Sequence, residues 1–279
     1  MKFILIAIIS FSIFFLYSCG GKKEQKIVLE STDLEAQMIE AYNKGVKALD
    51  EGDALYAAKN FNTVENIYPQ SIWAPRSVLM AAYSYYSQDY YGDAISELKR
   101  FLKNYPLNDN YPYAYFLIAT CYYELIVDEK KDLSSILESK KYYKILLNEF
   151  PNTDFSLDAK FKLLMIDNIL ASKEIYIGNY YVQRKKWIPA INRYKNVIEK
   201  YGETEYVEEA LHRLVEVNYA LGLENEAKKY AILLGYNYQS SEWYKESYRV
   251  FNKNYENPID KLKKDKQNII VRKFKELFK

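Results

Sequence analysis

The sequence predicts an all-α protein in which about five helix-turn-helix repeats stack into a superhelical array. Two observations predict this fold. The chain has 279 residues but only nine glycines, whereas Ala, Leu, Glu and Lys, which favour helices, are frequent. In addition, a short motif with a small residue, a larger apolar residue four positions later and a closing aromatic recurs along the chain. Such repetition at a period of tens of residues is typical of helical arrays.

The motif is clearest in GDALYAAKNFNTVENIYP and QDYYGDAISELKRFLKNYP, and three later stretches follow it more loosely. Residues four apart share one helix face, so the small residue admits a neighbouring helix and the larger one fills the groove beside it. A proline after the last turn ends the helix. The five matches are Ala57, Phe61 and Tyr68-Pro69; Ala94, Leu98 and Tyr105-Pro106; Ser139, Tyr143 and Phe150-Pro151; Ala190, Tyr194 and Tyr201-Gly202; and Ala227, Ala231 and Tyr238-Gln239.

These units resemble the tetratricopeptide repeat, a helix-turn-helix unit of 34 residues. The first helices of two units fit the resemblance, because residues 41–49 and 78–86 place small side chains on the face that meets the partner helix. Stacked repeats form a concave surface that binds peptides or helices of other proteins, so the resemblance implies a scaffold.

The two ends of the array carry helix signals. Thr32, with Glu35 three positions later, forms a capping-box pattern that predicts the start of the first helix. Asn257-Pro258 predicts the start of a last helix. Residues 252–279 hold nine Lys or Arg against four Asp or Glu, and they place an apolar stripe at Ile270, Phe274 and Leu277. We favour a helix that caps the last repeat, and contact with a membrane surface is the alternative.

The N-terminus reads as a bacterial lipoprotein signal. Residues 3–16 are almost all apolar, which is too short for a transmembrane helix of roughly 20 residues but suits a secretory signal peptide. The following LYSC resembles a lipobox, with Tyr17 where a small residue is usual. The resemblance implies cleavage before Cys19 and attachment of S-diacylglycerol and N-acyl chains to that cysteine. An ordinary signal peptide with a cysteine near its cut site by chance is the alternative.

The sequence therefore divides into four parts. Gly20 after the cysteine resembles lipoproteins that are passed on to the outer membrane, and the polar GGKKEQK favours a flexible tether. The parts are a signal peptide at 1–18, a lipidated cysteine with its tether at 19–31, a repeat domain at 32–251 (N-terminal repeats about 32–110, C-terminal repeats about 111–251) and a basic C-terminal helix at 252–279.

We find no pattern for catalysis, for a metal site or for a cofactor other than the lipid. The net charge of +2 gives no electrostatic argument for nucleic acid as a partner. His212 is the only histidine, and we expect a packing or surface residue. Cys121 lies in the apolar FLIATCYYEL and is expected to be an inert core residue. The sequence thus predicts a scaffold, and an enzyme that acts on peptidoglycan would need a polar constellation that we do not find.

Three stretches resemble the BamD family, the tetratricopeptide lipoproteins of the outer-membrane β-barrel assembly (BAM) machinery. AAYSYYSQDYYGDAISELKRFLKNYP is similar to the family's second repeat, NEFPNTDFSLDA to the junction after the third, and LASKEIYIGNYYVQRKKWIPAINRYKNVIEKY to the fourth. The residues of the fourth repeat that stand in matching places are Glu174, Gly178, Tyr180-Tyr181, Arg184 and Arg193.

The resemblance implies a lipid-anchored outer-membrane protein that faces the periplasm. It implies three kinds of partner: the barrel protein BamA, other BAM lipoproteins, and unfolded outer-membrane proteins, whose targeting signals end in an aromatic residue. Another periplasmic tetratricopeptide lipoprotein, such as a cell-division coordinator or a secretin pilot, is the alternative. We would not expect such a protein to reproduce the NYYVQRKKW segment.

Two clusters are candidates for these contacts. The first cluster consists of five tyrosines and one arginine. Because tyrosines of helical repeats mostly fill the core, we expect roughly two of these five tyrosines to be exposed. The second cluster is mainly basic, and a solvated basic face is the alternative interpretation of it. The substrate-groove candidates are Tyr83, Tyr85, Tyr86, Tyr90 and Tyr91, with Arg100 near an anionic carboxylate. The BamA-interface candidates are Arg184, Lys185, Lys186, Trp187 and Arg193.

Overall fold

The structure is a computed structural model that describes residues 23–126 and 132–253. These ranges contain eleven α-helices and no strand, which confirms the predicted all-α class. Cys19, Asn257-Pro258 and the basic C-terminal segment lie outside the described residues. The chain divides into two compact units, Met1–Glu124 and Leu125–Lys279.

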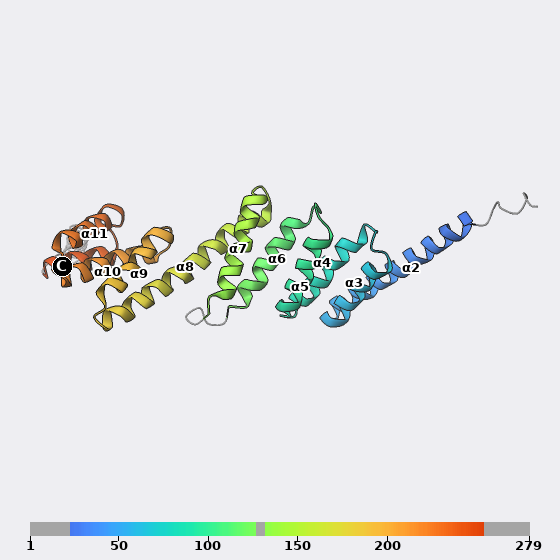
Figure 1. Cartoon of the computed structure of the whole chain (residues 1–279), viewed down its shortest axis with the longest axis horizontal. Coiled ribbons are helices and arrows are strands. Elements are labelled where there is room, and N and C mark those ends of the chain that lie inside the picture. Colours follow the sequence, from blue (N-terminus) through green and yellow to red (C-terminus); the bar gives the residue numbers. More distant parts are fainter. Residues whose placement is uncertain (1–22, 127–131, 254–279) are drawn as a thin grey trace, which may run out of the picture. The chain divides into compact units, whose positions relative to one another are not determined.

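In the first unit, each helix packs against the next as an antiparallel hairpin (Figure 1). Its helices are α2 (Lys23–Asp50), α3 (Ala54–Ile67), α4 (Trp73–Tyr86), α5 (Tyr91–Asn104) and α6 (Tyr111–Glu124). The sequence predicted a boundary between N-terminal and C-terminal repeats near residue 110. The helix α6 begins just after that boundary, but it belongs to the first unit.

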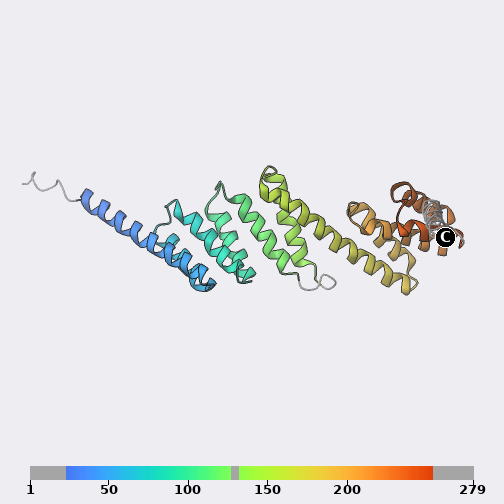
Figure 2. The ribbon, with the colours of Figure 1, turned by 180° about the vertical axis from the view of Figure 1, so that it is seen from behind.

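The second unit is also built of helical hairpins, and within it α10 packs against both α11 and α12 (Figure 2). Its helices are α7 (Ser134–Glu149), α8 (Asp154–Gln183), α9 (Trp187–Lys200), α10 (Tyr206–Ala220), α11 (Glu224–Asn237) and α12 (Glu242–Phe251).

The repeat frame that the sequence predicts is confirmed in the packing. The five small residues lie in alternate helices, from α3 through α11, and all five are buried together with the residue four positions later, which is larger in every case but Ala231. The closing aromatic is the C-terminal cap of its helix in every case; these caps are Tyr68, Tyr105, Phe150, Tyr201 and Tyr238.

The turns inside four hairpins share one backbone form. In each, a residue with positive φ follows the first helix, and the next residue donates its N–H to the carbonyl five positions back at 2.9–3.0 Å. This is the hydrogen bond of a Schellman motif, which satisfies a free carbonyl at the helix end. The positive-φ residues are Gly52 (80°), Asp89 (64°), Lys185 (55°) and Gly222 (75°).

The first helix begins earlier than the sequence suggested. It starts at Lys23, so the expectation that the capping box of Thr32 and Glu35 begins it is wrong. Residues 23–31, KEQKIVLES, contain neither glycine nor proline and are rich in Lys, Glu and Gln. Such residues favour helix strongly enough for α2 to extend through the cap pattern and into part of the predicted tether.

Candidate binding surfaces

The five predicted groove tyrosines lie where α4 turns into α5. Tyr83 and Tyr90 are 41% and 43% exposed, whereas the other three are half-buried. The rings form two groups: Tyr86 lies 6.4 Å from Tyr83 and 5.9 Å from Tyr91, and Tyr85 lies 6.4 Å from Tyr90, between centroids. The turn therefore presents two aromatic rings to solvent on a packed aromatic base.

The pKa values of the three half-buried tyrosines, Tyr85, Tyr86 and Tyr91, are raised. Tyr91 donates a hydrogen bond to the Asp89 carboxylate at 2.6 Å, and this bond raises the pKa of Tyr91 to about 12. Burial raises the pKa of Tyr85 and of Tyr86. The hydroxyls of the aromatic base below the two exposed rings are therefore uncharged at neutral pH.

Arg100 does not face an open anion site. Its guanidinium is held by the carboxylates of Glu65 and Glu97, with 2.5 Å to the Glu97 oxygen, and it donates to Asn62 Oδ1 at 2.8 Å. Tyr105 donates to the same Glu65 carboxylate at 2.5 Å, and Glu65 is buried. Arg100 therefore ties α5 to α3, and its charge is already compensated by two carboxylates.

The basic residues at the α8–α9 turn are, in contrast, presented to solvent. Arg184, Lys185 and Lys186 are all exposed, and none forms an ion pair with another described residue. The guanidinium of Arg184 lies 3.6 Å from the ring centroid of Tyr180, which is itself exposed. This stacking orients the guanidinium without neutralising its charge. We call these three residues the basic turn.

Arg193 joins α9 to α8. Its Nη1 lies 3.2 and 3.4 Å from the two carboxylate oxygens of Glu174, which also accepts from Asn196 Nδ2 at 3.1 Å. The Arg193 side chain is still 38% exposed, and it lines a hollow of about 320 Å³ with Tyr181 and Ile188. The ion pair thus holds Arg193 in place while leaving it accessible.

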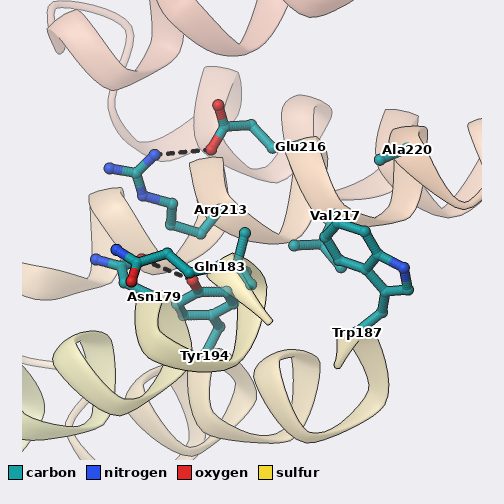
Figure 3. Close-up of a pocket in the computed structure, with 9 residues that line it drawn as sticks. Asn179, Gln183, Trp187, Tyr194, Arg213, Glu216, Val217 and Ala220 are labelled. Atoms are coloured by element: carbon teal, nitrogen blue, oxygen red, sulfur yellow. Dashed lines mark hydrogen bonds and ion pairs between the residues drawn. The ribbon is translucent and has the colours of Figure 1, made fainter. Parts of the chain in front are cut away.

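A pocket of about 490 Å³ opens between α8, α9 and α10, and Figure 3 shows its lining. Trp187 and Val217 supply part of its apolar lining. On the polar side of the pocket, Arg213 Nη1 donates a hydrogen bond to the Glu216 carboxylate at 2.8 Å. Trp187, predicted with the basic residues, is therefore half-buried in this pocket and does not share their exposure.

The sequence analysis missed the Arg213 ion pairs, although its spacing would have revealed them. Arg213 follows Glu209 by four residues and precedes Glu216 by three, which places all three on one helix face. Burial alone would raise the pKa of Glu216, but hydrogen bonds from His212 and Arg213 outweigh it and lower that pKa to about 2. The pocket therefore keeps an ionised carboxylate.

The two residues expected to be structural are indeed buried. His212 packs on Trp243 with centroids 5.1 Å apart, and its Nδ1 lies 3.0 Å from Ser247 Oγ. Cys121 is fully buried, and burial raises the pKa of its thiol to about 12. The thiol is thus protonated and shielded, which confirms that Cys121 is an inert core residue.

A second pocket, which the sequence analysis also missed, lies in the first unit. It has a volume of about 520 Å³, and α4, the α5–α6 loop and α6 supply its walls. Tyr83 lines it, so it adjoins the groove candidates. The lining residues are Ile72, Pro75, Arg76, Leu79, Met80, Tyr83, Asn108, Asn110 and Tyr113.

Across the described ranges, none of the helices combines the length and the hydropathy that a bilayer crossing needs. The same residues hold no group of three or more His, Cys, Asp or Glu arranged to bind a metal ion.

Residues 34–233 match the family model described as YfiO, outer membrane lipoprotein. The chain is 39% identical over 238 residues to the outer membrane protein assembly factor BamD of Rickettsia prowazekii, covering 85% of this chain and 93% of the relative. It is 37% identical over 237 residues to the protein of that name from Caulobacter vibrioides, covering 85% and 76%. The Pasteurella multocida protein of that name is 25% identical over 243 residues, covering 84% and 89%.

Proposed function

Because the chain belongs to the YfiO family of outer membrane lipoproteins, we propose that it is a BamD-type assembly factor that helps to insert β-barrel proteins into the outer membrane. The family match carries this proposal, because residues 34–233 include both candidate surfaces. No observation favours a cell-division coordinator or a secretin pilot. The role is that of a binding scaffold and not of an enzyme.

The attachment to the membrane is part of the proposal. Cys19 carries the lipid chains, and the repeats extend from it into the periplasm. The lipobox-like LYSC and the family description support this arrangement. Several acyl chains together give stable anchoring, whereas a single chain binds only marginally.

The second unit is proposed to bind a BamA-like barrel protein. The basic turn supports this, because its three residues form no ion pair with another described residue and the Arg184 guanidinium is already oriented on the Tyr180 ring. Arg193 adds an accessible guanidinium beside an apolar hollow. Acidic groups next to apolar side chains on the partner would complement this surface.

The first unit is proposed to bind segments of unfolded outer-membrane proteins. The exposed rings of Tyr83 and Tyr90 support this role. Such segments are rich in aromatic residues and expose backbone groups, and tyrosine offers apolar area together with a hydroxyl group. Arg100 is not part of this proposal, because two carboxylates already hold it.

A pull-down of the tagged full chain from detergent-solubilised native membranes tests the proposal. Mass spectrometry would identify the captured partners and the N-terminal residue of the tagged chain. We expect a BamA-like barrel protein together with a triacylated Cys19. Recovery of the acylated chain without a barrel protein would contradict the assembly role while supporting the lipid anchor.

A further inference from the structure

We propose that the C-terminal segment, residues 254–279, binds to the outer face of α11, where Ile232, Leu233 and Tyr236 lie, and thereby covers the apolar end of the repeat array within the same chain. The occupant of this surface is a part of the chain that lies outside the described residues. The inference does not depend on the proposed function, because it concerns the end of the array and not its partners.

The outer face of α11 is apolar where the equivalent faces of the other repeats are polar. Five and nine residues after the buried small residue of its repeat, α11 carries Ile232 and Tyr236, which are 64% and 83% exposed. Leu233 beside them is 41% exposed, so three apolar side chains gather at one place and indicate a covered surface. The equivalent residues of the other four repeats are Asn62 and Asn66, Lys99 and Lys103, Lys144 and Asn148, and Lys195 and Glu199.

Stacking of a further repeat would leave this face open. In α9, Lys195 and Glu199 occupy the same two positions, and both are exposed although α10 and α11 follow. The segment is therefore proposed to lie on the outer side of α11 and not to extend the array.

The chain leaves α12 beside the start of α11. Phe251, the last residue of α12, packs on a buried cluster that includes Ala227 of α11, and its ring centroid lies 5.4 Å from that of Tyr219 near the end of α10. The opposite end of α12 meets the end of α11, because a Cβ atom on Gly235 would lie 2.6 Å from Tyr244 Cε2. The chain therefore leaves the described structure at one end of α11, with the length of that helix beside it.

The segment is long enough to reach the exposed side chains. Residues 254–279 span about 39 Å even as one continuous helix, whereas the 14 residues of α11 span about 21 Å. The apolar stripe of Ile270, Phe274 and Leu277 lies in the second half of the segment. A segment that runs along α11 from its start therefore brings this stripe to the half of α11 that presents the apolar face.

The basic end of the segment would meet an acidic part of the second unit. Residues 254–279 contain eight Lys or Arg against four Asp or Glu, and four of the eight follow Ile270. Just after α11, the hydroxyl of Ser241 donates to the Glu208 carboxylate, which places the start of α10 at this end of α11. Neither Glu208 nor the exposed Glu205 forms an ion pair with a described residue. Opposite charges therefore favour this direction of the segment.

The test measures how fast a maleimide dye reacts with the thiol that Tyr236→Cys introduces. The chain is made from residue 19 onward with Cys19→Ser, so it carries no lipid and needs no detergent. Its other thiol, that of Cys121, is fully buried and does not compete for the dye. The comparison chain has a segment without the apolar stripe, through Ile270→Ser, Phe274→Ser and Leu277→Ser.

We expect Tyr236→Cys to react about tenfold more slowly with the native segment than with the serine segment, because a bound segment shields the thiol. The control is Tyr56→Cys in α3, whose native side chain is 49% exposed, and it should react at the same rate with both segments. Equal rates for Tyr236→Cys with both segments would overturn the inference.

The charges provide a second variant, which serves if circular dichroism shows that the serine variant is not folded. Arg272→Glu together with Lys275→Glu reverses two charges at the basic end of the segment. We expect this change to speed up the labelling of Tyr236→Cys, and salt at about 0.5 M to do the same for the native segment, because it screens exposed charges. Labelling that responds to neither change would contradict the proposed direction of the segment.

Two outcomes would assign the surface to another occupant and overturn the inference. Protection that increases with protein concentration would indicate a second copy of the chain. Protection that appears only when vesicles of phosphatidylglycerol are added would indicate a membrane surface, which basic and apolar residues also suit. Protection in dilute protein without lipid is the result that supports binding within one chain.

Discussion

The ring of Tyr194 packs against the bare backbone of Gly178. A Cβ atom added to Gly178 would lie 2.3 Å from Tyr194 Cε1, which is far closer than two carbon atoms can approach. Gly45 and Phe61 show the same relationship in the first unit, at 2.8 Å. In both units, therefore, the absence of a side chain on one helix allows the aromatic residue of the next helix to be fully buried.

The first prediction is that Gly178→Ala destabilises the second unit. Alanine favours helix over glycine by about 1 kcal/mol, but overpacking at a rigid contact costs about 1–3 kcal/mol or more. Because the overlap is severe, we expect a net loss of about 2 kcal/mol in the free energy of unfolding, measured by urea denaturation. Gly92→Ala is the matched control: its Cβ would meet nothing within 4 Å, so stability should stay unchanged or rise slightly. Equal effects of both substitutions would show that the contact is not rigid.

The second prediction concerns Lys185, which adopts the left-handed conformation at the α8–α9 turn with φ of 55°. A residue with a Cβ atom is disfavoured there by about 1 kcal/mol, and two of the other three equivalent turn positions hold glycine. Lys185→Gly should therefore raise the free energy of unfolding by about 0.5–1 kcal/mol. Lys186→Gly, at an ordinary φ of −93°, should not raise it. A loss of stability in Lys185→Gly would contradict this account.

The repeat frame was predictable because it depends on local geometry. The spacing from Ala190 to Tyr194 is one helical turn, and that turn is readable in the sequence alone. The start of α2 was not predictable from the capping box, because the helix preference of the preceding residues outweighs one cap.

The charged part of the sites could not be predicted in the same way. Arg100 and Glu65 are 35 residues apart and lie on different helices, so only the folded structure shows that this arginine is already paired. Such a property of the whole packing has no local signal in the sequence.

A third prediction follows for Arg100. Arg100→Met would leave the buried Glu65 carboxylate without its cation, and removal of one partner from a buried ion pair costs about 3–5 kcal/mol. Because the Arg100 side chain is 34% exposed, we expect a smaller loss, of about 2 kcal/mol, in chemical denaturation. Glu65→Gln in the same chain should restore part of it. If Arg100→Met instead left stability unchanged and abolished substrate binding, the original groove assignment would be favoured.

The fourth prediction is a pH dependence that arises from Glu216. Its pKa is lowered from an ordinary value of 4.5 to about 2 in the folded chain. A depressed folded-state pKa means that the ionised carboxylate contributes stability above about pH 4.5, and that this contribution disappears as the pH falls toward 2. Glu216→Gln should therefore lose less stability than the wild-type chain between these pH values. The Glu216 side chain is 41% exposed, so solvent screening keeps the effect modest. Identical pH profiles for the two chains would contradict the assignment.

The last prediction concerns Arg193 and the proposed barrel partner. Arg193 is accessible and is held by Glu174, so Arg193→Ala should weaken capture of the BamA-like protein about tenfold, as expected for an interface hot spot. Lys195→Ala, which changes an exposed lysine on the same helix, is the matched control and should leave capture unchanged. If Arg193 binds the partner directly, Glu174→Gln should have a smaller effect, because the guanidinium remains present but is less firmly positioned. If Glu174→Gln is as damaging as Arg193→Ala, the ion pair serves the packing of α8 against α9, and the partner contact must lie elsewhere, with the basic turn as the next candidate.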